Sequence, residues 1–103
     1  MEITIEELRE KIKKEQVQLL DIRSSPNFQE CHLKIPVKNI TLLKLSTHLH
    51  EFDKNKPIYT LCYHGVSSHL AAAYLNHQGF NAISVKGGIE EWKEKYPEDI
   101  NAS

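Results

Sequence analysis

The sequence predicts an α/β fold with a mostly parallel β-sheet covered by helices on both faces. The order of the segments supports this fold class, and the length of the chain sets the number of domains. Short apolar segments typical of buried strands alternate with segments of helical periodicity along the chain, and this alternation is the signature of a parallel sheet. The length of 103 residues is that of one small domain, so we expect a single domain over residues 1–103.

The composition is that of a soluble globular protein, with 40% apolar and 26% charged residues. Thirteen Lys and Arg against fourteen Asp and Glu give a formal charge of -1, so neither nucleic acid nor a membrane surface is an expected partner. The N-terminus lacks the long apolar region of a signal peptide, and we expect a cytoplasmic protein. Two cysteines far apart and without a CxxC pairing favour free thiols.

The first helix has a well-specified start. Thr4 and Glu7 have the spacing of a capping box, and Ile3 with Leu8 has the spacing of a hydrophobic staple. The apolar residues 17–22 that follow the helix predict a short buried strand.

A connection follows the first predicted strand. Ser25 and Pro26 suit the cap and first position of a brief helical turn through Phe28. We expect an irregular stretch around His32 and Pro36. Further on, the pattern predicts one apolar helical face, formed by Leu42, Leu45, Leu49 and Phe52.

The second half of the chain has clearer boundaries. Residues 53–57 break the preceding helix, and residues 58–62 predict an apolar strand that ends at Cys62. Residues 67–80 predict a helix capped by Ser67 and stopped by Gly79.

The C-terminal part contains one more strand and one more helix. Residues 82–85 predict a strand, and Gly87 and Gly88 predict a turn. The last helix begins near Ile89, has acidic residues in its first turn and ends at Pro97. We expect the tail after it to be frayed.

Cys62 lies between a predicted strand and a predicted helix, and ligands of open parallel sheets bind at the carboxyl ends of strands. Unpaired N–H groups and the dipole at a helix N-terminus stabilise a thiolate over a thiol. Gly65 allows backbone angles that would turn the N–H groups of residues 63–68 inward as an anion cradle. We therefore predict Cys62 as a reactive nucleophile.

The side chains of the same loop add possible donors to an anion. Ser67 and Ser68 offer hydroxyl groups, and Tyr63 and His64 can donate from the rim. None of them is an obvious proton-abstracting base. Each of these side chains also has a purely structural interpretation. His64 can be an exposed loop residue, Tyr63 a packing residue, and Ser67 a helix cap.

Cys62 also has a structural interpretation, as a small buried residue at the end of a core strand. Cys31 precedes His32, but this pair has no third partner, and we interpret it as structural or incidental. Four further histidines show no metal-ligand spacing, so no metal or other cofactor is expected. They are His48, His50, His69 and His77.

The sequence resembles the rhodanese family over nearly its whole length, with motifs in the order and spacing of that family. These motifs are LLDIR (19–23), residues 28–33, CYHGVSS (62–68), GF (79–80) and GGIEEW (87–92). The loop is similar to that of small bacterial single-domain thiosulfate sulfurtransferases. The resemblance implies a three-layer fold with a five-stranded parallel sheet.

The resemblance also implies a chemistry. Cys62 would take sulfane sulfur as a persulfide and pass it to cyanide or a thiol. Residues 63–68, which include Val66, would cradle the transferred sulfur. The donor would be thiosulfate or a persulfide, and a protein persulfide or protein thiol is a further possible partner.

The chain departs from the family in three places. Many family loops carry arginine where Ser67 stands, so less fixed positive charge is available for thiosulfate. Cys31, His32 and Leu33 replace a glycine, histidine, isoleucine run, and residues 35–40 contain an extra residue.

Two alternative functions remain open at this stage. Related phosphatase and arsenate reductase loops place an arginine six residues after the cysteine, where this chain has Ser68. Serine does not replace a guanidinium clamp, so these activities are disfavoured. The second alternative is a non-catalytic rhodanese-like binding module, against which the retained cysteine and glycine-containing loop argue.

Overall fold

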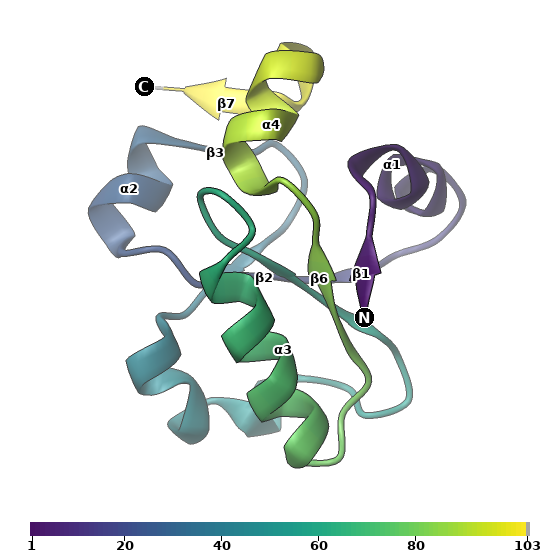
Figure 1. The fold of residues 1–103 in the computed structure, drawn as a ribbon, viewed down its shortest axis with the longest axis vertical. Coiled ribbons are helices and arrows are strands. Elements are labelled where there is room, and N and C mark those ends of the chain that lie inside the picture. Colours follow the sequence, from purple (N-terminus) through teal and green to yellow (C-terminus); the bar gives the residue numbers. More distant parts are fainter. Residues whose placement is uncertain (103) are drawn as a thin grey trace.

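A computed structural model describes residues 1–102 of the chain. Five strands form one sheet in the order β1-β6-β5-β2-β4, and every neighbouring pair is parallel. Figure 1 shows α1 and α4 on one side of this sheet and α3 on the other. The predicted α/β class and the five-stranded parallel sheet are thus confirmed. The sheet strands are β1 (Glu2–Ile3), β2 (Gln18–Asp21), β4 (Lys38–Asn39), β5 (Ile58–Leu61) and β6 (Ala82–Val85).

Four α-helices connect the strands, and two further strands form a small antiparallel ribbon. The helices are α1 (Ile5–Lys14), α2 (Ser25–Glu30), α3 (Ser67–His77) and α4 (Gly88–Lys95). Strand β3 (Cys31–Leu33) pairs with β7 (Ile100–Ala102), which follows the 3₁₀ turn η3 (Pro97–Asp99).

Local sequence signals specify the ends of the main helices. The side chain of Thr4 accepts the Glu7 N–H, and the Glu7 carboxylate accepts the Thr4 N–H, so the predicted capping box is confirmed. Gly79 follows α3 as predicted. The N–H of Phe80 donates to the carbonyl of Leu75 at 3.0 Å, which closes the helix end.

Two predicted helix caps are wrong. Helix α2 begins one residue earlier than expected, because Ser24 and not Ser25 accepts the N–H of Asn27. Helix α3 has Val66 at its N-cap, with no side-chain cap, and Ser67 is its first residue.

Other predictions fail where long-range pairing decides the structure. The segment around His32, expected to be irregular, is strand β3, and the tail expected to fray is strand β7. Two short edge strands were not predicted: β1, which contains Ile3, and β4, which lies before the segment at residues 42–52. The predicted helix at residues 42–52 is two 3₁₀ turns, η1 (Leu42–Thr47) and η2 (Leu49–Glu51).

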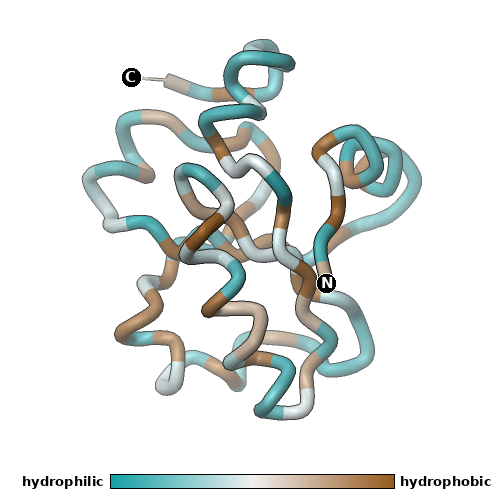
Figure 2. The backbone as a smooth tube through the Cα atoms, in the orientation of Figure 1, coloured by the Kyte–Doolittle hydropathy of each residue, from teal (hydrophilic) through white to brown (hydrophobic). Residues whose placement is uncertain are grey.

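The sheet separates two apolar clusters, and apolar residues concentrate along the central strands (Figure 2). The cluster on the α1 and α4 side contains Leu8, Cys31 and Trp92. The cluster on the α3 side contains Leu45, Cys62 and Leu75. The two cysteines of the chain therefore belong to different layers of the core.

Candidate active site

The alternation of side chains along β5 determines where Cys62 points. Tyr59 and Leu61 belong to the cluster on the α1 and α4 side, and Ile58 belongs to the cluster on the α3 side. Because successive side chains of a strand point to opposite faces, Cys62 faces the N-terminus of α3. Its side chain is 5% exposed.

The sulfur of Cys62 is held by backbone donors of the following loop. The N–H of Gly65 donates to Sγ at 3.0 Å, and the N–H of Ser68 donates to Sγ at 3.3 Å. Ser68 is the second residue of α3, so the sulfur satisfies one of the first N–H groups of the helix, which have no partner within the helix. These donors and the helix dipole favour negative charge on the sulfur.

Close packing between the loop and α4 maintains this geometry. Gly65 has a φ of 90°, and a Cβ atom at this position would lie 2.9 Å from the N atom of Gly87. A Cβ atom on Gly88 would lie 2.5 Å from the carbonyl oxygen of Cys62. The N–H of Ile89 donates to that carbonyl at 2.9 Å. The turn at 87–88 thus holds the loop, a role that the sequence did not indicate.

Ser68 has its hydroxyl directed into the protein. The residue is fully buried, and its Oγ lies 2.7 Å from the Oγ of Ser84 on β6. The hydroxyl of Thr60 donates to the Ser68 carbonyl at 2.8 Å. Ser68 therefore contributes its backbone N–H to the sulfur, while its side chain ties α3 to the sheet.

The other predicted site residues form the exposed rim of the loop. Tyr63 is 51% exposed and Val66 is 72% exposed, and Ser67 is also exposed. The rings of Tyr63 and His64 are in edge contact. His64 Nδ1 lies 2.5 Å from the Oε2 atom of Glu90, in the first turn of α4. Sequence reasoning gave Glu90 only a helix-dipole role.

A second polar cluster lies after β2. The Arg23 guanidinium donates to both carboxylate oxygens of Asp21, and both side chains are at most 5% exposed. Its Nη2 donates to the Cys31 carbonyl at 2.7 Å, and its Nη1 lies 3.9 Å from the Cys31 sulfur. The structure thus surrounds Cys31 with a buried ion pair, separate from the Cys62 loop.

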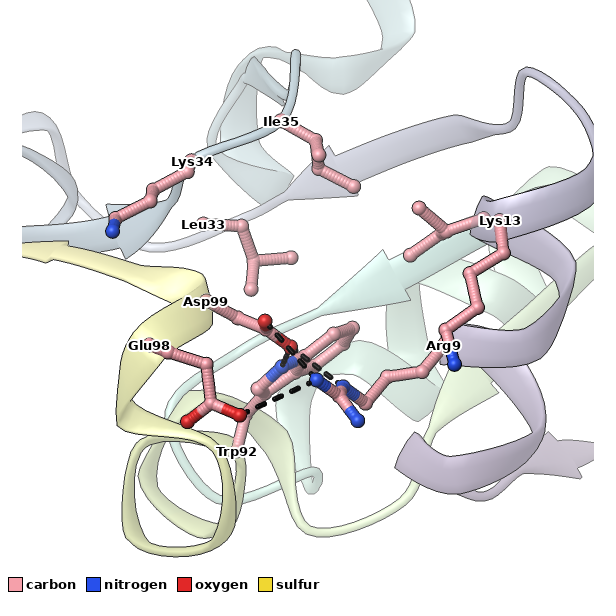
Figure 3. Close-up of a pocket in the computed structure, with 9 residues that line it drawn as sticks. Arg9, Lys13, Leu33, Lys34, Ile35, Trp92, Glu98 and Asp99 are labelled. Carbon is pink, nitrogen blue, oxygen red and sulfur yellow. Dashed lines mark hydrogen bonds and ion pairs between the residues drawn. The ribbon is translucent and has the colours of Figure 1, made fainter.

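A pocket of about 180 Å³ lies between α1, β3, α4 and η3 (Figure 3). Three of its charged groups contact one another, since Arg9 donates to Asp99 at 2.7 Å and lies 3.5 Å from Glu98. The indole N–H of Trp92 donates to the Asp99 carboxylate at 2.8 Å. None of its lining residues comes from the loop at 62–68. This pocket therefore belongs to the packing of α1 against the C-terminal ribbon.

Within residues 1–102, no group of three or more His, Cys, Asp or Glu side chains is placed to hold a metal ion. No helix in this part of the chain has the length and apolar character needed to cross a membrane. Both cysteines are free.

The parallel sheet and the cysteine loop at its carboxyl edge define an α/β protein of the rhodanese-like class. The family model described as rhodanese-like domain matches residues 4–95. The chain belongs to this family.

Known proteins that are similar to this chain in sequence or in structure support this assignment, and the similarity covers most of the chain. The chain is 35% identical over 89 residues to a thiosulfate sulfurtransferase GlpE of Coxiella burnetii, covering 85% of this chain and 82% of the relative. A rhodanese-like domain protein of Staphylococcus aureus is similar in structure, with a TM-score of 0.83, 31% identity and coverage of 89% and 91% of the two chains. The reduced CoADR-RHD of Bacillus anthracis matches with a TM-score of 0.87 and 26% identity, over 96% of this chain and 17% of that protein.

Proposed function

We propose that the protein is a sulfurtransferase that moves sulfane sulfur from a donor to an acceptor through a persulfide on Cys62. The observation that carries this proposal is the pair of backbone N–H groups on the Cys62 sulfur, at 3.0 and 3.3 Å. Such donors stabilise the thiolate, which is the nucleophilic form of cysteine. Membership of a family with a thiosulfate sulfurtransferase among its relatives supports the same chemistry.

The first half-reaction loads the sulfur. The Cys62 thiolate attacks the sulfane sulfur of the donor, a new S–S bond forms, and the remainder of the donor leaves with the electron pair of its broken bond. With thiosulfate the leaving group is sulfite. The negative charge then lies on the outer sulfur, within reach of a loop built from backbone donors.

The second half-reaction unloads the sulfur to cyanide or to a thiol. The acceptor attacks the outer sulfur, and Cys62 returns to the thiolate that Gly65 and Ser68 hold. The loop contains no arginine, so we expect thiosulfate to bind more weakly than an uncharged or thiol-derived donor.

The alternative is a non-catalytic binding module that keeps the fold for partner recognition. The exposed apolar side chains near the loop favour a protein partner, since Tyr63, Val66 and Leu70 are 51%, 72% and 61% exposed. The same exposed surface is also compatible with catalysis if the sulfur donor or acceptor is a protein persulfide or a protein thiol.

Intact-mass measurement tests the proposal. Incubation with a sulfane-sulfur donor is expected to add about 32 Da, and peptide mapping is expected to place the added sulfur on Cys62. The isolated persulfide is expected to discharge to cyanide or a small thiol in a single turnover without donor. Steady-state rates should give the parallel lines of ping-pong kinetics.

The same measurement separates the two alternatives. A verified Cys62 persulfide that discharges to neither acceptor would leave the binding module as the better interpretation. A label on Cys31 alone would show that the nucleophile assignment is wrong.

A further inference from the structure

Three fully buried hydroxyl side chains lie together beneath the start of α3. This hydroxyl cluster consists of Thr60 on β5, Ser84 on β6 and Ser68 in the first turn of α3, and each residue is 0% exposed. Thr60 and Ser84 are register partners on neighbouring strands. Asp21 and Arg23 are also buried polar residues, but they form an ion pair of their own. The hydroxyl cluster carries no charge, so its hydrogen bonds determine its role.

The neighbouring pair of side chains on the same face of the sheet is apolar. Ile58 and Ala82, the register pair that precedes Thr60 and Ser84 on the same two strands, belong to the apolar cluster on the α3 side. Because side chains alternate along a strand, Thr60 and Ser84 point to this face, as Cys62 does. A buried hydroxyl costs free energy unless it is hydrogen-bonded, so both hydroxyls need partners at this place.

Both hydroxyls have their partner in Ser68. The Thr60 hydroxyl donates to the Ser68 carbonyl at 2.8 Å, and the Oγ atoms of Ser84 and Ser68 lie 2.7 Å apart. The N–H of Ser68 donates to the Cys62 sulfur at 3.3 Å. Ser68 is thus held at its carbonyl, at its side chain and at its N–H. Thr60 and Cys62, two residues apart in the sequence, make two of these three contacts.

The contact between the Ser68 N–H and the sulfur depends on this support. It is the longer of the two contacts that hold the sulfur, at 3.3 Å against 3.0 Å for the N–H of Gly65. A hydrogen bond weakens as its atoms separate, so a shift of α3 by a few tenths of an ångström would remove much of this contact. Gly65 is fixed separately, by its close packing against Gly87. The hydroxyl cluster is what fixes Ser68.

Resting on the proposed sulfurtransferase function, we infer that Thr60 and Ser84 are positioning residues for the Cys62 nucleophile. Both act through Ser68, whose N–H they keep on the sulfur, where it stabilises the thiolate. Loss of either hydroxyl leaves less of Cys62 in the thiolate form at neutral pH, which slows the loading step. The same loss makes the Cys62 sulfur a poorer leaving group in the unloading step.

The test is the alkylation of Cys62 by iodoacetamide on the full chain, followed by peptide mapping to separate Cys62 from Cys31. Rates are measured from about pH 5 to about pH 10, because only the thiolate reacts. Thr60→Val and Ser84→Ala each remove one hydroxyl. Both variants are expected to move the midpoint of the pH–rate profile upward by about 0.5 or more, which lowers the rate below the midpoint about threefold. The limiting rate at high pH should change by less than about twofold.

Conservative variants separate positioning from packing. Thr60→Ser and Ser84→Thr keep a hydroxyl, and their profiles are expected to stay with that of the wild type. Valine has nearly the shape of threonine, so Thr60→Val changes hydrogen bonding far more than packing, and urea denaturation verifies the fold. The titratable side chains at the rim of the loop, Tyr63, His64 and Glu90, are the same in all variants. Equal shifts in Thr60→Val and Thr60→Ser would overturn the role of the hydroxyl.

Asn76 provides a matched control at the other end of α3. Its Oδ1 accepts the N–H of Ala82 on β6 at 2.8 Å, and its Nδ2 donates to the Ala82 carbonyl at 3.1 Å. Asn76→Ala is expected to lower the free energy of unfolding and to leave the alkylation profile of Cys62 unchanged. A shift equal to that of Thr60→Val would mean that any loosening of α3 disturbs the sulfur, and it would overturn the specific role of the hydroxyl cluster.

The possible failures are distinguishable. Profiles of Thr60→Val and Ser84→Ala that coincide with the wild-type profile would overturn the positioning role. Because alkylation needs no sulfur donor, that result would leave the sulfurtransferase proposal standing. Failure of the wild-type protein to form a persulfide at Cys62 would overturn the proposed function, and the alkylation profiles would still decide whether the hydroxyl cluster positions the sulfur.

Discussion

The two cysteines of this chain are equally buried and differ in what surrounds their sulfur atoms. Cys62 is 5% exposed and Cys31 is 7% exposed. The Cys62 sulfur accepts two backbone N–H groups at the start of α3. The Cys31 sulfur lies 3.9 Å from a guanidinium nitrogen of Arg23.

The comparison shows that burial alone does not identify a reactive thiol. The charge of Arg23 is already balanced by Asp21, and Cys31 lies in a strand paired with β7. Within the part of the chain that the structure describes, the N–H groups of Gly65 and Ser68 donate only to the Cys62 sulfur, because they belong to a loop and to the first turn of a helix. The environment of Cys62 therefore suits a sulfur anion, and that of Cys31 suits a packed thiol.

The largest expected effect comes from exchanging the two thiols for hydroxyls. Cys62→Ser is expected to lower sulfur transfer by at least about 10³-fold, because the nucleophile is lost. Cys31→Ser should keep transfer within about threefold, since its sulfur lies outside the proposed chemistry. Transfer rates and persulfide mass measure both. Full transfer activity in Cys62→Ser would show that Cys62 is not the nucleophile.

The next effect concerns the loop that holds the Cys62 sulfur. Gly65→Val places a side chain at a φ of 90°, against the Gly87 backbone. We expect both half-reactions to slow by at least about tenfold, because the N–H of Gly65 is displaced from the sulfur.

Gly79 provides a matched control for the loop. It has a φ of 94°, and the nearest atom to an added Cβ is the flexible end of Lys54 at 3.5 Å. Gly79→Val is expected to cost about 1–2 kcal/mol of stability through backbone strain and to leave transfer by the folded protein unchanged. Equal loss of activity in both variants would mean that backbone strain, and not the sulfur contact, is responsible.

A smaller effect is expected from adding charge to the loop. Ser67→Arg should lower the Michaelis constant for thiosulfate by about three- to tenfold, because a guanidinium attracts the dianion. Ser67 makes no side-chain cap to α3, so the substitution leaves the helix start intact. Circular dichroism checks the fold, and a constant that stays the same or rises would contradict the electrostatic argument.

Cys31 is expected to matter for stability. Cys31→Ala should lower the free energy of unfolding by about 1–2 kcal/mol, through lost packing and the lost contact with Arg23. Urea denaturation measures the change. A loss of transfer activity in the folded variant, with stability unchanged, would reverse the roles of the two cysteines.

The smallest expected effect is the pH dependence of the contact that anchors the C-terminal ribbon. The Arg9 guanidinium hydrogen-bonded to Asp99 holds the pKa of that carboxyl below its usual value. A lowered pKa in the folded state stabilises the protein above the ordinary Asp value, and this contribution is lost as the pH falls through the folded value. The stability difference between wild type and Asp99→Asn should therefore shrink in urea titrations taken from neutral pH into acid. A constant difference would contradict this.

The sequence by itself determined the elements whose signals are local. The capping box at Thr4 and the glycine stop at Gly79 involve residues within one or two turns, and the structure reproduces both. Strands β5 and β6 follow from short apolar runs between turn residues. The placement of Cys62 between a strand and a helix N-terminus follows from the same local pattern.

Tertiary structure decided the features that depend on distant partners. Strands β3 and β7 are short, and neither has a signal of its own, so only their pairing across about seventy residues makes them strands. The expected Ser67 cap is absent from α3, and the sulfur of Cys62 accepts an N–H of the first turn because the loop brings it to the N–H of Ser68. The sequence also gave no sign that His64 and Glu90 are neighbours, because Glu90 lies 26 residues after His64 and only the packing of α4 against the loop brings the two side chains together.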